Sequence, residues 1–202
     1  MKRFGEGMKT VKVLVLFVFG AILGTVCDLF HVVNDITGYN YKSFGEQAWW
    51  TPVIFGLATL AIALSHASFD QKWGANKRLL TWPKVLYGLM GFVFLYYISG
   101  YWSVLSHMKF VILALGALTV WYMFDKSGYG VIYMILTAII GCAVEISLVK
   151  AGQFYYTNAE IFGIVLWLPF LYMTGSVAVG NLGRKLFQGE PIATECSCGR
   201  AA

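Results

Sequence analysis

Charged residues are scarce in this sequence. Asp, Glu, Lys and Arg make up 12% of its 202 residues, whereas a soluble domain carries about 25%. Its 3 histidines are scattered, and no His-x-x-x-His, His-Glu-x-x-His or Cys-x-x-Cys spacing occurs, so the sequence offers no recognisable metal site. A glycine-rich phosphate-binding loop is also absent. These gaps argue against the common classes of soluble metalloenzyme and nucleotide-binding protein.

Cysteine is rare as well, with 4 in the chain. Cys27 and Cys142 fall within apolar segments, where a free cysteine packs as a small hydrophobic residue. Cys196 and Cys198 form a single Cys-x-Cys pair in the tail, which supplies too few ligands for a closed zinc site. The spacing indicates no disulfide framework.

Long apolar stretches are abundant instead. The chain is 58% hydrophobic and 17% aromatic, and its apolar runs approach the length of about 20 residues that a helix needs to cross a bilayer. The predicted fold class is all-α: a polytopic membrane protein with six transmembrane helices. The sequence predicts a single domain over residues 1–190, followed by a short, disordered cytoplasmic tail over 191–202. The predicted helices cover residues 11–30, 49–67, 83–102, 109–124, 129–151 and 161–182.

Basic residues are distributed unevenly between the loops. Twelve lysines and arginines fall on the side of the two termini, and only Lys42, Lys109 and Lys150 fall on the other side. Because basic loops stay in the cytoplasm, both termini are predicted to be cytoplasmic. This topology accounts for the net charge of +5, so we expect no nucleic-acid partner.

The last apolar segment has the composition of a helix that packs against other helices in lipid. Pro169 lies within it and predicts a kink near Leu166. Its glycines and other small residues allow a second backbone to approach closely, and Asn181 can hydrogen-bond to a neighbouring helix. Arg184 and Lys185 then mark the membrane boundary.

Two acids within the predicted helices are candidate functional groups, because ionisable side chains are costly inside a bilayer. Asp28 precedes His31 by one helical turn, a spacing that allows a hydrogen bond. Glu145 lies about one turn from Lys150. The favoured interpretation is that both acids are solvated or extend to the interface. The alternative is an acid or base in a lipid enzyme, although no nucleophile or metal ligand accompanies either residue.

Asp125 lies in the segment WYMFDKS, at the cytoplasmic end of the fourth predicted helix. It falls in a tight turn between two helices, where Asp commonly caps the next helix. As an acid on a mostly basic side, it could equally meet a cationic partner or a lipid head group. The residues alone leave both roles open.

Several segments resemble one family of membrane proteins. WYMFDKS at 121–127, QFYYTN at 153–158, and the WLP and TGSVAVGNLGRKL elements at 167–186 resemble the Insig (insulin-induced gene product) family. AWWTP at 48–52 resembles the entry to that family's second helix. From about residue 110 to 186 the match requires no insertion or deletion. The first hundred residues resemble the family mainly in helix spacing.

The resemblance implies a six-helix, non-enzymatic membrane protein that binds a lipid between its helices and uses no other cofactor. Animal members sense oxysterols and retain sterol-regulatory membrane partners in the endoplasmic reticulum, and microbial relatives are thought to hold diacylglycerol-like lipids. By this resemblance, Trp121 is the aromatic residue of the lipid-binding helix, and Asp125 is the acid that partner binding requires. Met108 stands where sterol-binding members have a glutamine, which removes a hydrogen-bond donor for a sterol hydroxyl.

The leading hypothesis is a protein that holds a diacylglycerol-like or sterol-like lipid in a cavity open toward the cytoplasmic leaflet, along the first, third, fourth and fifth helices. The residues assigned to this lipid site are Phe92, Tyr96, Tyr97, Met108 and Trp121. A small integral-membrane lipid-modifying enzyme is the alternative. The expected partners are a membrane lipid and a membrane protein bound on the cytoplasmic side, and a homo-oligomer is left open. We expect the inner (cell) membrane for a prokaryotic protein and the endoplasmic reticulum for a eukaryotic one.

Overall fold

The computed structural model describes residues 2–43, 45–73 and 80–187. These residues form six helices and one two-stranded sheet. The helices are α1 (Lys2–Val32), α2 (Thr51–Trp73), α3 (Trp82–Tyr101), α4 (Ser106–Phe124), α5 (Gly128–Lys150) and α6 (Leu168–Phe187). The strands are β1 (Thr37–Tyr39) and β2 (Phe154–Tyr156). The six predicted helices are confirmed, whereas the predicted tail over 191–202, with Cys196 and Cys198, lies outside the described residues.

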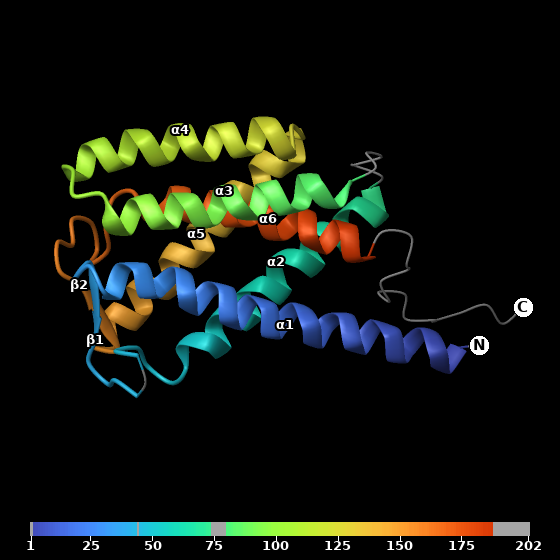
Figure 1. Ribbon diagram of the computed structural model, residues 1–202, viewed down its shortest axis with the longest axis horizontal. Coiled ribbons are helices and arrows are strands. Elements are labelled where there is room, and N and C mark those ends of the chain that lie inside the picture. Colours follow the sequence, from blue (N-terminus) through green and yellow to red (C-terminus); the bar gives the residue numbers. More distant parts are fainter. Residues whose placement is uncertain (1, 44, 74–79, 188–202) are drawn as a thin grey trace, which may run out of the picture.

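Consecutive helices run in opposite directions along the bundle (Figure 1). The start of α1 and the end of α6 lie at the same end, which we call the inner end, where the Lys12 ammonium donates a hydrogen bond to the Leu186 carbonyl at 2.8 Å. The sheet and the α3–α4 turn lie at the opposite, outer end (Figure 1). An even number of crossings leaves both termini on one side, as the distribution of basic residues predicts.

Helix α6 lies at the centre of the bundle and packs against α2, α3, α4 and α5. Most of its residues are buried. Its small residues permit this packing, because a Cβ at Gly183 would lie 2.3 Å from the Ala63 carbonyl oxygen. The predicted hydrogen bond from Asn181 to a neighbouring helix is also present, since its amide donates to the Phe124 carbonyl of α4 at 3.1 Å. The prediction of a helix built for close packing is confirmed.

The predicted kink in this helix is wrong. Helix α6 begins at Leu168, so Pro169 lies in its first turn instead of its middle. The first turn suits proline, because the backbone donor that proline lacks would have no partner within the helix there. The residues before it, predicted as helix from Ile161, instead form a turn in which Phe162 and Gly163 have positive φ angles of 51° and 87°.

The lipid-facing surface follows from composition. In the described part of the chain, four stretches are long and apolar enough to span a membrane: residues 10–32, 51–70, 106–124 and 128–150. Large apolar side chains are exposed on their outer faces, among them Ile22, Leu115 and Ile139. Exposed apolar surface of this extent is costly in water and favourable against acyl chains. Cys27 is buried and Cys142 half-buried, both as free thiols, in agreement with their predicted packing role.

The sheet joins two loops that are far apart in the sequence. Strands β1 and β2 pair antiparallel, with Thr37 opposite Tyr156 and Tyr39 opposite Phe154. Tyr39, Phe154 and Tyr156 are buried, and Tyr155 faces outward. The sequence interpretation did not predict this sheet. It brings three aromatic side chains over the outer end of the bundle.

Candidate functional site

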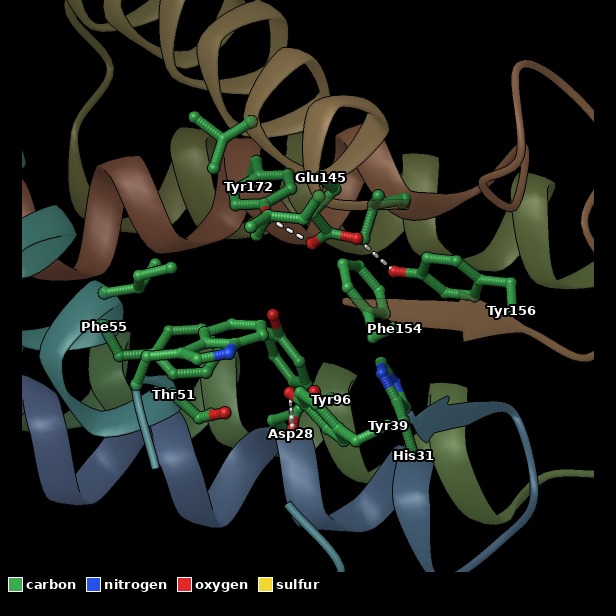
Figure 2. Close-up of a pocket in the computed structure, with 15 residues that line it drawn as sticks. Asp28, His31, Tyr39, Thr51, Phe55, Tyr96, Glu145, Phe154, Tyr156 and Tyr172 are labelled. Carbon is green, nitrogen blue, oxygen red and sulfur yellow. Dashed lines mark hydrogen bonds between the residues drawn. The ribbon is translucent and has the colours of Figure 1, made fainter. Parts of the chain in front are cut away.

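A narrow cavity lies beneath the sheet, between α1, α2, α5 and α6 (Figure 2). Its volume is about 50 Å³, counted as the space open to the centre of a water molecule. On that measure a single water needs roughly 10–15 Å³, so the cavity has room for only a few waters or a small polar group. The residues that line it are Asp28, His31, Tyr39, Trp50, Thr51, Ile54, Phe55, Tyr96, Val144, Glu145, Leu148, Phe154, Tyr156, Leu168 and Tyr172.

Asp28 of α1 is held by two donors. Its Oδ2 accepts hydrogen bonds from the Tyr39 hydroxyl and from the Gln47 amide, each at 2.7 Å. The same amide group of Gln47 also donates to the Thr25 carbonyl at 3.0 Å. These bonds fix the carboxylate at the cavity wall through one of its oxygens, Oδ2.

Glu145 of α5 is held in the same way from the opposite wall. The hydroxyls of Tyr156 and Tyr172 donate to its two carboxylate oxygens (Figure 2). One tyrosine comes from the sheet and the other from α6, so three elements meet at this carboxylate. The interpretation that Asp28 and Glu145 reach the interface is wrong, because both acids face the cavity and are bonded to its walls.

His31 completes the α1 wall. Its Nε2 lies 2.7 Å from the Ser99 hydroxyl of α3, and its ring stacks on Tyr96 with 5.2 Å between ring centres. The predicted hydrogen bond between Asp28 and His31 is therefore replaced by separate partners for each. His31 and Asp28 lie one turn apart on the helix, and each faces a different neighbour.

Two of the tyrosines are held in their neutral form. Burial raises the pKa of Tyr39 above its usual value, and the neighbouring Asp28 carboxylate raises it further. Burial and then the Glu145 carboxylate raise the pKa of Tyr156 in the same direction. Both hydroxyls therefore keep their proton at neutral pH and remain donors to the carboxylates.

One wall of the cavity is apolar and faces the bilayer. Trp50, just before α2, and Ile54 and Phe55 of α2 form one side of it, and Val144 and Leu148 of α5 form the other. Both helices rest on α6. Because the sheet forms the roof, this wall belongs to the outer half of the bundle. This cavity lies at the end of the bundle away from the termini (Figure 1), so it is not the one predicted to open toward the cytoplasmic leaflet, and that cavity stays a prediction.

A second polar cluster lies at the inner end. The Asp125 carboxylate lies 3.3 Å from Nη1 of Arg184, whose Nε lies 2.8 Å from Asp70. The Ser127 hydroxyl donates to Asp125 at 2.6 Å and accepts from the Gly130 amide at 2.9 Å. Ser127, not Asp125, is therefore the N-cap of α5. Arg184, predicted at the membrane boundary, is instead buried in this cluster.

The comparison with known families identifies the chain. The family model described as "Insulin-induced protein (INSIG)" matches residues 11–187. The chain belongs to the INSIG family. The membership of this family predicted from the sequence is confirmed.

Relatives of the chain include animal and bacterial INSIG proteins. It is 30% identical over 183 residues to the insulin-induced gene 1 protein of Cricetulus griseus, covering 88% of this chain and 71% of that protein. The human protein of the same name is 29% identical over 183 residues, with coverage of 88% and 66%. The crystal structure of the Insig homologue from Mycobacterium vanbaalenii has a TM-score of 0.81 and 26% identity, covering 90% of this chain and 97% of that one. A crystal structure of the same homologue as a cross-linked trimer gives a TM-score of 0.80.

These comparisons confirm the six-helix membrane fold and place the chain in a regulatory, non-catalytic family. This INSIG-family chain is therefore an integral membrane protein. In the part of the chain that the structure describes, no group of three or more His, Cys, Asp or Glu side chains is placed to hold a metal ion.

The lipid-site residues assigned from the INSIG resemblance are dispersed. Only Tyr96 lines the cavity, and Phe92 packs edge-on against it at 5.1 Å between ring centres. Tyr97 and Met108 are each 47% exposed on the outer surface. Trp121 lies near the inner end, where its indole N–H donates to a carbonyl in the α4–α5 turn at 3.1 Å. Their assignment to a lipid stays a prediction.

Sequence reasoning missed most of the cavity's polar groups. Tyr39, Tyr156 and Tyr172 were not among the predicted site residues. A usable signal was present, because an unpaired acid inside a span requires hydrogen-bond donors, and tyrosine is the commonest donor in the loops beside Asp28 and Glu145. The predicted partner-binding role of Asp125 also stays a prediction, since here its carboxylate is buried against Arg184.

Proposed function

We propose that this INSIG-family protein is a non-enzymatic membrane regulator that holds one diacylglycerol-like lipid. The lipid's glycerol head would lie in the cavity beneath the sheet, and its acyl chains would lie along the apolar wall between α2 and α5. The observation that supports this most is the pairing of two anchored carboxylates with a wall that faces the bilayer.

The polar groups of the cavity favour a neutral head that carries a hydroxyl. Asp28 and Glu145 present carboxylate oxygens, which accept hydrogen bonds. No lysine or arginine is among the lining residues. A phosphate would therefore meet two carboxyl groups and no cation, which disfavours it in a medium of low dielectric constant. The free hydroxyl of a diacylglycerol could donate to either acid.

The cavity has room for the head of the lipid but not for its acyl chains. About 50 Å³ is too small for an acyl chain or a rigid sterol ring system, since pockets that bury whole ligands measure roughly 300–1,000 Å³. Flexible chains can leave through the wall and lie on the exposed side chains of Leu57 and Val144. Burial contributes little when the lipid already starts in hydrocarbon, so hydrogen bonds to the head would provide the selectivity. This favours a diacylglycerol over a sterol.

The rival function is a small lipid-modifying enzyme. It is favoured by the finding that both candidate acids, Asp28 and Glu145, face one cavity. Its weakness is that each carboxylate is already bound by two hydrogen-bond donors, and no serine, cysteine or lysine lines the cavity to act as nucleophile. Turnover would appear as a lipid of altered mass after incubation with the wild type but not with the Asp28→Asn, Glu145→Gln double variant.

Native mass spectrometry of the gently extracted protein tests the proposed function. We expect one diacylglycerol-like lipid per chain. Leu148→Trp places a larger side chain in the wall and should abolish its retention. Ile139→Trp is the matched control, because Ile139 is exposed on the opposite face of α5. The proposal would be contradicted if both variants retained the lipid equally, or if the bound lipid were a sterol.

The same spectra report the assembly. The crystallised relative from Mycobacterium vanbaalenii forms a cross-linked trimer, and we propose a homotrimer for this chain as well. We also propose a membrane-protein partner that binds on the cytoplasmic side. The proposed host membrane is the inner (cell) membrane for a prokaryotic protein and the endoplasmic reticulum for a eukaryotic one. A purely monomeric spectrum in mild detergent would contradict the trimer and leave the lipid result intact.

A further inference from the structure

A second hollow, separate from the cavity, opens at the outer end of the bundle. It lies between the end of α1, the α3–α4 turn and the loop after β2, and consists of two adjoining spaces of about 220 and 600 Å³. The two spaces share Ile36, Val104, Lys109 and Asn158, and none of their lining residues lines the cavity beneath the sheet. We call this hollow the outer groove.

Lys109 is the only basic residue that lines the outer groove. It is half-buried. Its ammonium donates a hydrogen bond to the Ser99 carbonyl at 2.8 Å and lies 5.5 Å from the centre of the Trp167 ring. These contacts hold the charge at the edge of the groove and use only part of its capacity, because an ammonium has three donors.

The position of Lys109 is unfavourable for an isolated cation. It lies in the first turn of α4, which begins at Ser106, and the positive end of the helix dipole disfavours a cation there. The two other lysines at the outer end are placed differently. Lys42 forms an ion pair with Glu46, and Lys150 lies at the C-terminal end of α5, where the dipole favours it.

Lys109 has no ion-pair partner in the part of the chain that the structure describes. Glu160 lines the smaller space, but its Oε2 already accepts hydrogen bonds from the Ser106 hydroxyl at 2.7 Å and the Leu166 amide at 2.9 Å. A half-buried cation that retains free donors and makes no ion pair favours binding of an anion, because charge-assisted hydrogen bonds to an anion offset its desolvation.

The remainder of the groove defines the kind of anion. Ser103 and Asn158 supply a hydroxyl and an amide beside Lys109, both suited to phosphate oxygens. Leu105 and Met108 form an exposed apolar rim that continues along α4 to Val111 on the lipid-facing surface. The polar, cationic part of the groove suits a charged head group, and the apolar rim suits acyl chains. The two together fit an anionic amphiphile.

We propose that the outer groove binds the head group of an anionic phospholipid in the leaflet away from the termini. The phosphodiester monoanion accepts hydrogen bonds from Lys109, Ser103 and Asn158, and the acyl chains pass over Leu105 and Met108. This site goes beyond the neutral-lipid site of the proposed function, with which it shares no residue.

The experiment measures thermal unfolding of the full-length protein in detergent with added phosphatidylglycerol, with phosphatidylcholine, and with inorganic phosphate alone. We expect phosphatidylglycerol to raise the unfolding temperature more than phosphatidylcholine does, and inorganic phosphate to have no comparable effect. Lys109→Gln should weaken the apparent affinity for phosphatidylglycerol by about tenfold or more, the loss expected for one charge-assisted hydrogen bond.

Two further variants make the result specific. Lys109→Arg keeps the charge and should keep the preference for phosphatidylglycerol, which shows that the site itself is tolerant of substitution. Lys150→Gln removes a cation from the same end of the bundle and should leave the preference unchanged. The proposal is overturned by an unchanged preference in Lys109→Gln, by an equal loss in Lys150→Gln, or by equal stabilisation with inorganic phosphate. Retention of the neutral lipid by Lys109→Gln in native mass spectra separates this result from the fate of the cavity.

Discussion

Nη1 of Arg184 lies 3.3 Å from Oδ2 of Asp125, and the two residues are 5% and 1% exposed. The pair joins the central helix to the α4–α5 turn, and the contact from Arg184 to Asp70 adds the end of α2. A buried arginine between two carboxylates is costly to desolvate, so loss of one partner leaves an uncompensated charge.

Breaking this pair should destabilise the protein strongly. We expect Asp125→Ala to lower the free energy of unfolding by about 3–5 kcal/mol, the usual result of removing one member of a buried ion pair. Thermal unfolding in detergent micelles measures the change. Lys185→Met is the control, because it removes the neighbouring cation, which lies over the Trp82 ring at 6.0 Å. Equal unfolding temperatures for Asp125→Ala and the wild type would show that the pair contributes nothing.

The hydrogen bonds to Glu145 predict a difference between adjacent tyrosines. Tyr156→Phe removes a hydroxyl that donates to Glu145 and should cost about 0.5–1.5 kcal/mol or more, since the acceptor is charged. Tyr155→Phe changes the next residue along β2, whose side chain faces outward, and should be nearly neutral. If the two substitutions have the same effect on the unfolding temperature, the carboxylate is not held by the Tyr156 hydroxyl.

Alkaline pH should weaken the fold through the same groups. The pKa values of Tyr39 and Tyr156 are raised in the folded state by burial and by the adjacent carboxylates, whereas in the unfolded chain a tyrosine titrates near about 10. The stabilising contribution is therefore fully present below about pH 10 and is lost as the pH rises above it, because the unfolded state releases its protons first. Unfolding temperatures between about pH 8 and 11 should show this decline.

A double variant isolates that contribution. Tyr39→Phe combined with Tyr156→Phe removes both ionisable hydroxyls and should flatten the alkaline decline, although the protein starts from a lower stability. Tyr41→Phe, at an exposed position, should keep the slope of the wild type. An unchanged slope in the double variant would assign the alkaline sensitivity to other groups.

Close packing of the central helix can be tested with two glycines. A Cβ at Gly183 would lie 2.3 Å from the Ala63 carbonyl oxygen, whereas a Cβ at Gly128 meets nothing within 4 Å. Gly183→Ala should therefore destabilise by about 1–3 kcal/mol through overpacking, and Gly128→Ala should be neutral or slightly stabilising. Denaturant or thermal unfolding compares them directly. Tolerance of alanine at Gly183 would mean that α2 and α6 can separate without loss.

Features that depend on local composition were predictable from the sequence. The six helices, the common side of the termini and the small-residue face of α6 follow from apolar length, basic residues and glycine content. Pro169 was misjudged, because a proline in the middle of an apolar run and a proline in the first turn of a helix look alike until the start of the helix is known. The turn at Phe162 and Gly163 is marked in the sequence only by its glycine, which was too weak a signal to locate that start.

The cavity was not predictable in the same way, because its partners lie far apart in the sequence. Glu145 and Tyr172 meet only after α5 and α6 pack together, and Tyr39 reaches Asp28 because β1 pairs with a strand more than a hundred residues away. Tyr96 and Tyr97 show that even on a single helix, residue type alone does not predict which side chain lines the cavity. Neighbours on a helix point about 100° apart, so one lines the cavity and the other faces lipid.

The seam between α2 and α5 is fastened at its two ends. At the outer end, β1 pairs with β2 and so joins the segment before α2 to the segment after α5. At the inner end, Arg184 forms ion pairs with both Asp70 and Asp125. Toward the inner end His66 of α2 also packs on Tyr133 of α5, with 4.3 Å between ring centres. Just inside the sheet, by contrast, the seam is closed by side chains such as Phe55 and Leu148. We therefore expect a lipid to enter laterally from the bilayer as those side chains rotate. The helix ends would not need to separate, and the lipid would not need to pass through water.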